Sequence, residues 1–346
     1  MSIRTVPIIL VGFGNAARRL AELLIERAYQ IEDRYHVRFI CTAIATARHG
    51  SVVSSAGLDL TAALTRVRNG DSLVGLMGAQ PVADAFVAIE RSRAEILIET
   101  TTLNIEDGEP ACSHIRHALN LGKHVLTANK GPLAFAAQQL RALARERNLS
   151  LRYESTVMDG APIFNLVERT LPLVQINKLR GIVNSTTNFI LTAMETGRSY
   201  QSALAEAQAR GIAEADASLD VDGWDAAVKA TVLANCLMGA NLLPTAVVRT
   251  GIGELSTDQL VAARLAGKKI RLVTTVIRSD SEVKASVAPE EIASEDLLYF
   301  IDEYSNVLIF ETDLMGTIAL VEQQPDLTQT AYGLLSDLLA ILPSLN

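Results

Sequence analysis

Two residues four positions apart, Asp225 and Lys229, form the clearest pair for acid–base chemistry in the sequence. Residues i and i+4 of a helix share one face, so this carboxylate can hold this ammonium. The predicted helix continues into residues 230–248, which carry no charge, and this indicates burial. A partly buried ammonium can protonate a carbonyl oxygen while a hydride reaches its carbon. Taken alone, the pair could equally be an ordinary surface ion pair.

The use of basic residues makes Lys229 more informative. All five histidines lie within the first 124 residues, and only seven of the 31 basic residues are lysines. Proton transfer in the later two-thirds of the chain must therefore use lysine, acidic residues, tyrosine or water. A lysine can lose its proton near neutral pH when its surroundings lower its pKa, whereas an arginine cannot.

A second lysine, Lys130, follows the strand predicted at 124–127. It lies at the carboxyl edge of the sheet, where open α/β sheets bind ligands. A lysine before Gly131-Pro132 can also be an exposed turn residue, so a role in the site and a plain turn both stay open.

Four acidic residues precede the Asp225 helix, namely Glu214, Asp216, Asp220 and Asp222. They do not form a calcium loop, because Thr231 stands where a bidentate glutamate would be needed. Two interpretations stay open: a solvated acidic loop, or carboxylates that bind a substrate ammonium. Cys112, His114 and His117 are close enough in sequence for a metal, but we expect these histidines on a polar helix surface.

A glycine-rich turn links an apolar strand to an amphipathic helix near the start of the chain. Gly12 would make the bend, Gly14 would let a pyrophosphate approach the backbone, and Ala17 would let helix and strand pack closely. The N–H groups at the start of the helix, with Asn15 and Ala16, would face the phosphates. This context favours a dinucleotide site over the alternative, a plain turn between strand and helix.

The end of the second predicted strand distinguishes the two nicotinamide cofactors. An acidic residue there would bind the adenosine ribose of NAD. The chain instead has Ala45-Thr-Ala-Arg48-His, and Arg48 could bind the 2′-phosphate of NADP. The sequence therefore favours NADP over NAD, with a solvated Arg48 as the alternative.

Strands alternate with helices in the first part of the chain. Apolar runs predict strands at 7–11, 37–45, 96–99, 124–127 and 151–154. Helical patterns between them predict an α/β fold with a Rossmann-type, doubly wound parallel sheet. We expect this dinucleotide-binding domain to span residues 1–152.

The pattern changes after Gly160-Ala-Pro162. Helical segments then mix with strand-like runs at 178–183, 269–277 and 307–311. This mixture predicts a second, α+β domain over residues 153–326 for substrate binding and dimerisation. A helix at about 327–343 would pack back on the first domain.

Composition excludes several classes of partner. The chain has 346 residues, 49% of them hydrophobic, and a net charge of −8, which disfavours nucleic acid and anionic membranes. Asn235, Gly239 and Pro244 interrupt the uncharged stretch, so we expect a buried helix there and no membrane span. Three scattered cysteines and no visible targeting signal predict a cytoplasmic protein.

Together, these motifs resemble those of the homoserine dehydrogenase family over most of the chain. The matching segments are Gly12-Phe-Gly14, Glu99-Thr100-Thr101, Gly122–Leu133, Gly160-Ala-Pro162, Asn184–Leu191 and Glu214–Lys229. The resemblance implies reduction of L-aspartate 4-semialdehyde to L-homoserine with NAD(P)H, in threonine and methionine biosynthesis. It also implies a homodimer.

The resemblance implies roles for individual residues. Lys229 would donate the proton with Asp225 as its partner, and Lys130 would lie beside the nicotinamide and the substrate. Residues near the substrate would be Glu214, which would bind its amino group, Thr186 and Asp220. Thr100 and Thr101 would join the glycine turn around the cofactor. A structural monovalent cation such as Na⁺ would be bound, mostly by backbone oxygens, at Glu154, Val157, Asp159 and Ala161.

Two segments depart from the family pattern. Ser185 stands where the family usually has glycine, and residues 323–331 lack the glycines of a late loop. These departures leave open a related dehydrogenase that acts on another amino-acid semialdehyde, or a dinucleotide-binding sensor without turnover. The sequence also ends about where a catalytic core would, so we expect little feedback inhibition by threonine.

Overall fold

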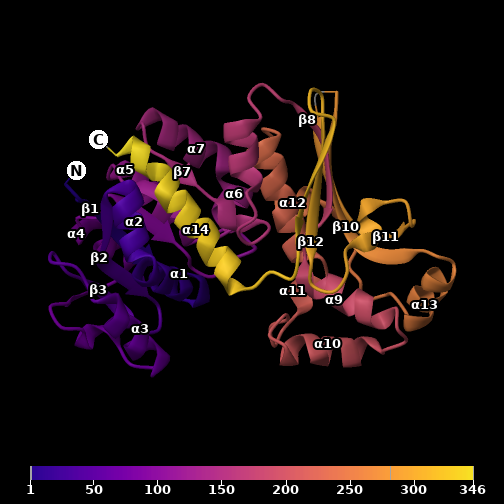
Figure 1. The fold of residues 1–346 in the computed structure, drawn as a ribbon, viewed down its shortest axis with the longest axis horizontal. Helices are drawn as coiled ribbons and strands as arrows, with labels where there is room; N and C mark the ends of the chain where they lie inside the picture. Colours follow the sequence, from indigo (N-terminus) through magenta and orange to yellow (C-terminus); the bar gives the residue numbers. More distant parts are fainter. Residues whose placement is uncertain (1, 281, 346) are drawn as a thin grey trace. The chain divides into compact units, whose positions relative to one another are not determined.

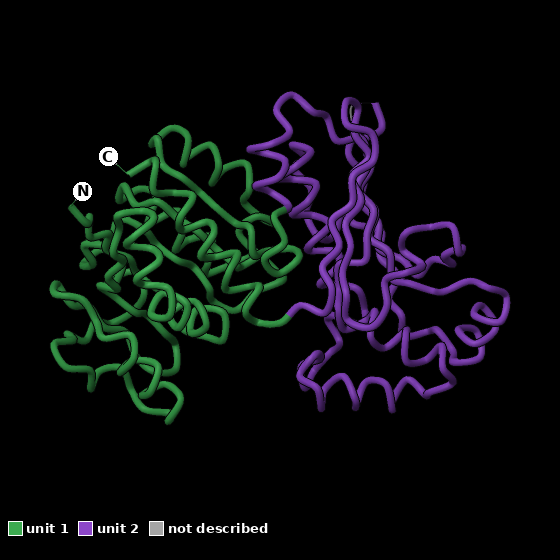
Figure 2. Tube along the Cα trace, in the orientation of Figure 1, with its two compact units in different colours: residues 1–162, 326–346 green, residues 163–325 purple. Residues whose placement is uncertain are grey.

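The computed structural model describes residues 2–280 and 282–345, which divide into two compact units. Unit 1 comprises Met1–Pro162 and Asp326–Asn346, and unit 2 comprises Ile163–Pro325. Figure 1 shows the fold, and Figure 2 colours the two units separately. Unit 1 is therefore completed by the end of the chain.

Unit 1 is built on a seven-stranded sheet with the order β4-β3-β2-β1-β5-β6-β7. Its parallel strands are β1 (Arg4–Val11), β2 (Val37–Thr46), β5 (Ile96–Glu99), β6 (His124–Thr127) and β7 (Leu151–Arg152). The short strands β3 (Gly50–Val53) and β4 (Gln80–Val82) extend one edge in antiparallel fashion. This arrangement confirms the predicted Rossmann-type sheet.

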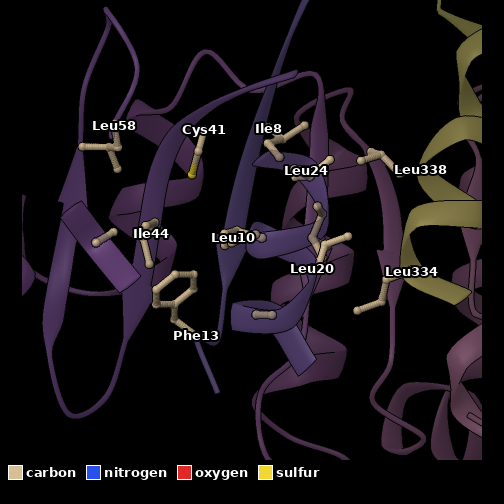
Figure 3. Packing of buried hydrophobic residues seen from close by; sticks show 14 of the residues in the cluster. Ile8, Leu10, Phe13, Leu20, Leu24, Cys41, Ile44, Leu58, Leu334 and Leu338 are labelled. Carbon is tan, nitrogen blue, oxygen red and sulfur yellow. The ribbon is translucent and has the colours of Figure 1, made fainter. Parts of the chain in front are cut away.

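Helices alternate with these strands. They are α1 (Asn15–Glu26), α2 (Ala28–Tyr35), α3 (Leu60–Arg68), α4 (Ala85–Arg91), α5 (Ala111–Asn120), α6 (Gly131–Phe135) and α7 (Ala137–Glu146). The last long helix, α14 (Leu327–Ile341), packs against α1. Figure 3 shows Leu334 and Leu338 of α14 in one cluster with Leu20 and Leu24 of α1. The burial of this apolar surface holds the end of the chain on unit 1.

Unit 2 contains a six-stranded sheet with the order β13-β12-β8-β10-β11-β9. The strands are β8 (Ile176–Ile182), β9 (Val248–Arg249), β10 (Lys269–Ser279), β11 (Glu282–Ile292), β12 (Asn306–Thr312) and β13 (Thr317–Glu322). The accompanying helices are α8 (Ile163–Asn165), α9 (Ser185–Met194), α10 (Tyr200–Ala209), α11 (Ser218–Val221), α12 (Trp224–Leu237) and α13 (Thr257–Leu265). Because α12 packs on β10 and β11, its residues 226–228 and 230–236 are buried.

Several details differ from the sequence prediction. The predicted strand at 151–154 is only two residues long, and Glu154–Thr156 form a 3₁₀ turn. One of the helical segments expected after Pro162 is irregular: a short α-turn, Ile163–Asn165, is followed by π-helix over Leu166–Thr170. Strands β11 and β13 are not foreseen. Exposed and buried residues alternate through much of β11, which therefore has no long apolar run. Strand β13 has a short apolar run, Ile318–Val321, but none of its residues is buried. Within the described residues no helix is long and apolar enough to cross a membrane.

Candidate active site

The glycine turn of unit 1 is fixed by its neighbours on both sides. The Gly12 N–H donates to the Ala45 carbonyl at 2.9 Å, and Thr100 Oγ1 donates to the Gly12 carbonyl at 3.0 Å. Gly12 has a φ of +86°, and a Cβ there would lie 2.6 Å from the Thr100 backbone. Only glycine therefore fits at this close approach of two loops.

Gly14 lies directly before helix α1 and leaves the N-terminus of this helix uncovered. Among the residues that the structure describes, no heavy atom lies within 4 Å of the position that its Cβ would take, and no side chain caps α1. The first N–H groups of the helix, from Asn15 to Ala17, are therefore available to a ligand. The positive end of the helix dipole adds to their attraction for a phosphate.

A cleft of about 330 Å³ lies against this turn, within unit 1. It is lined by Gly12, Phe13, Gly14, Arg18, Thr46, Ala47, Arg48, His49, Val67, Thr100, Thr101 and Thr102. The cleft therefore joins the predicted phosphate turn to Arg48, Thr100 and Thr101. None of these lining residues is acidic, while two are arginines, so the lining fits a dinucleotide with an additional phosphate.

A buried carboxylate, Glu99, organises the loop that closes one side of the cleft. Glu99 is fully buried at the end of β5, and its Oε1 accepts a hydrogen bond from Thr101 N at 3.1 Å. The hydroxyl of Thr101 donates to the same oxygen, and that of Thr127 donates to Oε2 at 3.2 Å. These bonds compensate part of the cost of burying the charge and fix the Thr100–Thr102 backbone.

The loop after β6 is joined to the same hydrogen-bond network. Asn129 is buried, and its Nδ2 donates to the Thr101 carbonyl at 3.0 Å. Its Oδ1 accepts from Gly131 N at 2.9 Å, across Lys130. Lys130 is thus held at the N-terminus of α6, at the carboxyl edge of the sheet. Sequence reasoning placed Glu99 and Asn129 in family motifs without giving them these roles; for Glu99, a charged residue that ends an apolar strand was the available signal.

The predicted acid–base pair lies on α12 in unit 2. Lys229 Nζ is 3.1 Å from Asp225 Oδ2, and the two side chains are only 14% and 15% exposed. The ammonium also donates to the Val183 carbonyl at the end of β8. Two of its three N–H groups are therefore engaged by described residues, and the third is available for an acceptor. The surface ion-pair interpretation does not fit this burial.

Asn184 connects this pair to the acidic segment before it. Its Nδ2 donates to Asp220 Oδ1 at 2.7 Å and to Asp225 Oδ2 at 3.0 Å. Its Oδ1 accepts from Thr187 N at 2.8 Å and so caps α9. One buried amide therefore fixes two carboxylates against the start of a helix. Sequence reasoning placed Asn184 in a family motif without giving it this role.

The pKa of the Asp220 carboxyl is raised from its ordinary value. Burial raises its pKa, and the negative charge of Asp225 raises it further. The hydrogen bond from Asn184, the charge of Lys229 and a hydrogen bond involving Thr186 act in the opposite direction. Two carboxylates that share one partly buried site repel each other, so such a pair is typical of a functional site.

The other predicted substrate residues differ in their surroundings. Thr186 is buried, and its hydroxyl donates to the Ile212 carbonyl at 3.1 Å. Glu214 is exposed in the loop between α10 and α11, where Gln208 Nε2 donates to its backbone carbonyl at 3.2 Å. The structure therefore brings together Asp220, Asp225 and Lys229, while Glu214 stands in an exposed loop.

The segment predicted to bind a cation is compact. Glu154 and Val157 are buried, and Asp159 has a φ of +40° and accepts a hydrogen bond from Thr330 Oγ1 at 2.7 Å. Over residues 2–280 and 282–345, no three His, Cys, Asp or Glu side chains gather as a metal site. A cation here would therefore need backbone oxygens.

The expectation of surface histidines was wrong for His114. This residue is 4% exposed, its ring centroid lies 5.0 Å from that of Phe86, and its Nδ1 is 3.8 Å from Glu99 Oε1. Because α5 packs on the sheet, His114 lies on its buried face. His117 lies nearer the surface, with Nε2 3.2 Å from Glu90 Oε1.

The dinucleotide cleft on a Rossmann-type sheet and the buried lysine–aspartate pair define a class of protein: an NAD(P)-dependent dehydrogenase. Comparison with known proteins identifies the family. The family model "Homoserine dehydrogenase" matches residues 162–339. The chain therefore belongs to the homoserine dehydrogenase family, NAD(P)-dependent oxidoreductases that act on a CH–OH group.

Three relatives illustrate the similarity. The chain is 37% identical over 333 residues to the NAD⁺-dependent homoserine dehydrogenase of Pseudomonas canavaninivorans, with 96% of this chain and 95% of that one covered. It is 33% identical over 338 residues to the Methanocaldococcus jannaschii homoserine dehydrogenase, covering 97% and 98%. A hyperthermophilic archaeal homoserine dehydrogenase in complex with NADPH superposes with a TM-score of 0.83 at 28% identity, covering 99% of each chain.

Proposed function

We propose that the chain reduces L-aspartate 4-semialdehyde to L-homoserine, with Lys229 as the proton donor. The bound nicotinamide dinucleotide supplies the hydride. The observation that carries this assignment is the third N–H of Lys229, which no described residue occupies while Asp225 and Val183 hold the other two. This N–H can bind the carbonyl oxygen of the aldehyde and pass its proton to the alkoxide that forms.

Asp225 orients Lys229 for this reaction. Its carboxylate oxygen Oδ2 lies 3.1 Å from the lysine Nζ. Asn184 donates to the same Asp225 oxygen, Oδ2, that pairs with the lysine, and so helps to fix the carboxylate. Lys130, at the carboxyl edge of the sheet in unit 1, would lie beside the nicotinamide and the substrate.

Three further residues would bind the amino-acid end of the substrate. Asp220 and Glu214 offer carboxylates to the substrate ammonium, and Thr186 offers a hydroxyl. The buried position of Asp220 beside Asp225 supports its role, because an added ammonium would relieve the repulsion between the two carboxylates. For Glu214, support comes from its exposed, unburied carboxyl group.

NADP is the proposed preferred cofactor. The support is the cleft lining, where Arg18 and Arg48 occur without any acidic residue to bind a ribose 2′-hydroxyl. The relatives differ in this respect, since one is named for NAD⁺ and another is solved with NADPH. The preference must therefore be read from this chain's own residues.

The test is a semialdehyde reduction assay with both nicotinamides and the variant Arg48→Ala. We expect the KM for NADPH to rise about tenfold, because a charge-assisted hydrogen bond contributes roughly 1.5–3 kcal/mol. The KM for NADH should change by less than about twofold, since NADH lacks the 2′-phosphate. Equal effects on both cofactors would exclude Arg48 as the phosphate-binding residue.

A structural monovalent cation is proposed at Glu154, Val157, Asp159 and Ala161. Its support is the compact backbone of this segment, with the left-handed conformation of Asp159. Thermal unfolding in NaCl and in tetramethylammonium chloride of equal ionic strength tests the site, because only Na⁺ can be coordinated. Identical unfolding temperatures would argue against a cation.

A cytoplasmic homodimer is proposed as the working form. Burial raises the pKa of the Cys41 and Cys112 thiols to about 12, and all three cysteines are free, as suits a reducing compartment. Leu314 and Met315, at the turn between β12 and β13, are 68% and 55% exposed and offer an apolar contact to a second copy. Sedimentation equilibrium of the purified protein would distinguish dimer from monomer.

A further inference from the structure

Unit 1 contains a second hollow that the proposed reaction does not use. It has a volume of about 250 Å³ and is lined by Thr42, Val53, Ser54, Ser55, Gln80, Arg91, Ser92 and Arg93. None of these residues belongs to the dinucleotide cleft. The lining is almost entirely polar, contains two arginines, and has no acidic residue.

The two arginines have no counter-ion among the described residues. Arg91 ends α4 and Arg93 follows two residues later, and neither makes an ion pair or side-chain hydrogen bond in the described part of the chain. The neighbouring acids are engaged elsewhere: Glu90 lies 3.2 Å from His117, and Glu95 pairs with Arg4 at 2.8 Å. Two unpaired guanidinium groups thus lie at one polar hollow, in a chain with a net charge of −8.

Hydrogen bonds fix two of the residues that line the hollow, Thr42 and Ser92. Thr42 lies at a bulge where the pairing of β2 with β1 skips one residue. Its hydroxyl is 2.8 Å from that of Ser92 and donates to the Ile8 carbonyl at 3.2 Å. β-Bulges redirect side chains and recur next to functional sites. The hydroxyl of Ser54, in a residue only 7% exposed, has no partner among the described residues and can donate to a ligand.

A buried lysine, Lys123, lies against the C-terminal end of α4, next to the hollow. The C-terminus of a helix is the negative end of its dipole and would repel an anion near Ser92. Lys123 is 7% exposed, and its Nζ donates to the carbonyls of Ser92 and Ala94 at 3.1 and 2.8 Å. Burial lowers the pKa of Lys123, and its two hydrogen bonds offset the carbonyl dipoles at the end of α4.

We propose that this hollow is a binding site for the phosphate or carboxylate groups of a small anionic metabolite. Arg91 and Arg93 would hold the anionic oxygens, and Ser54 would donate a hydrogen bond to them. Guanidinium groups suit both kinds of oxyanion because they donate paired, charge-assisted hydrogen bonds. Thr42 is four residues before Thr46 of the dinucleotide cleft on the same strand, so an anion here would bind next to the cofactor-binding strand.

The test is thermal unfolding of the full chain with inorganic phosphate or citrate as the probe. Saturating NADP⁺ fills the dinucleotide cleft, and NaCl keeps the ionic strength equal. We expect one or both probes to raise the Tm of the wild type by about 2 °C or more, because a ligand that binds only the folded state stabilises it. Phosphate alone would assign a phosphate-bearing ligand, and citrate alone a polycarboxylate.

The double variant Arg91→Ala/Arg93→Ala should lose this shift. Both side chains are exposed, so the variant is expected to fold, and an unchanged affinity for NADP⁺ checks this. The matched control is Arg116→Ala/Arg145→Ala, which removes two exposed arginines of unit 1 away from the hollow and should keep the shift. No shift in the wild type, or an equal shift in both double variants, would overturn the proposal.

Discussion

Glu99 shows how a single buried residue positions a ligand-facing loop. Its carboxylate accepts two hydrogen bonds from Thr101 and one from Thr127, so it fixes the residues that line the cleft. The variant Glu99→Gln keeps the size of the side chain but replaces one acceptor oxygen by a donor. We expect kcat/KM for NADPH to fall by about tenfold or more, since a lost buried hydrogen bond to a charged group costs roughly 1.5–3 kcal/mol.

The matched control for this prediction is Glu95→Gln. Glu95 precedes the same strand and makes a half-exposed ion pair with Arg4, so its loss should leave NADPH kinetics unchanged. The NADPH kinetics of the two variants are compared at a temperature at which thermal unfolding shows both proteins to be equally folded. Equal kinetics for the two variants would show that Glu99 does not position the cofactor loop.

Asp220 gives a pH-dependent prediction at the same scale. Because its pKa is raised in the folded state, folding favours the protonated carboxyl, and its ionisation destabilises the protein. The stability that the protonated form confers is lost as pH rises from the ordinary carboxyl pKa through the raised one. The variant Asp220→Asn cannot ionise, so at pH 7.5 its Tm should exceed that of the wild type by about 2 °C or more.

Thermal unfolding of both proteins between pH 4 and pH 8 checks this assignment. The difference in Tm should shrink as pH falls toward the ordinary carboxyl pKa, where the wild-type group is also protonated. A difference that is constant with pH, or that favours the wild type at pH 7.5, would contradict the raised pKa. Turnover should fall in the variant, since Asp220 is a proposed substrate residue.

At the scale of elements, the docking of α14 depends on two glycines. A Cβ at Gly160 would lie 2.1 Å from the Gln329 carbonyl oxygen, and one at Gly333 would lie 2.4 Å from Ser155 Oγ. The turn after β7 therefore approaches the backbone of α14 directly. This contact gives a structural reason for the Gly160-Ala-Pro162 motif, which sequence reasoning could quote but not explain.

The variant Gly160→Ala should weaken this docking. We expect a loss of about 1–3 kcal/mol of unfolding free energy, because the clashing atom belongs to a helix backbone and cannot rotate away. Gly253→Ala is the control, since its nearest contact would be an ordinary 3.9 Å. Urea unfolding measures both variants, and a Gly160→Ala protein as stable as the control would contradict the close approach.

The late segment that departs from the family pattern has a structural role of its own. Asp326 caps α14 by accepting a hydrogen bond from Thr328 N at 2.5 Å, and Gln329 completes a capping box. Thr330 in the same turn donates to Asp159. Residues 326–331 thus start a helix instead of forming a glycine-rich loop.

At the scale of the whole molecule, sequence reasoning succeeded where local patterns carry the information. Strand β1, the turn at Gly12 and Gly14, and helix α1 follow from apolar runs, glycine spacing and helical periodicity. The fold class and the family were therefore predictable. The face shared by Asp225 and Lys229 was also predictable, since it depends only on helix geometry.

Contacts between distant segments could not be predicted in this way. Asn184 donates a hydrogen bond to Asp220, and Thr127 donates one to Glu99, in each case between segments far apart in the sequence. The burial of His114 likewise depends on the packing of its helix against other elements. Strand β11 was not predicted because its burial is set by its partners in the sheet and not by an apolar run of its own. Contacts of this kind can be identified only once the three-dimensional structure is known.

Turnover of the variant Lys229→Ala shows whether Lys229 donates the proton. The kcat for L-aspartate 4-semialdehyde reduction should fall by about 10²–10⁴-fold, while the Kd for NADPH changes by less than about threefold. Lys284→Ala, which removes an exposed lysine of β11, should keep the wild-type kcat. A Lys229→Ala enzyme with a kcat within threefold of the wild type would show that Lys229 is not the proton donor.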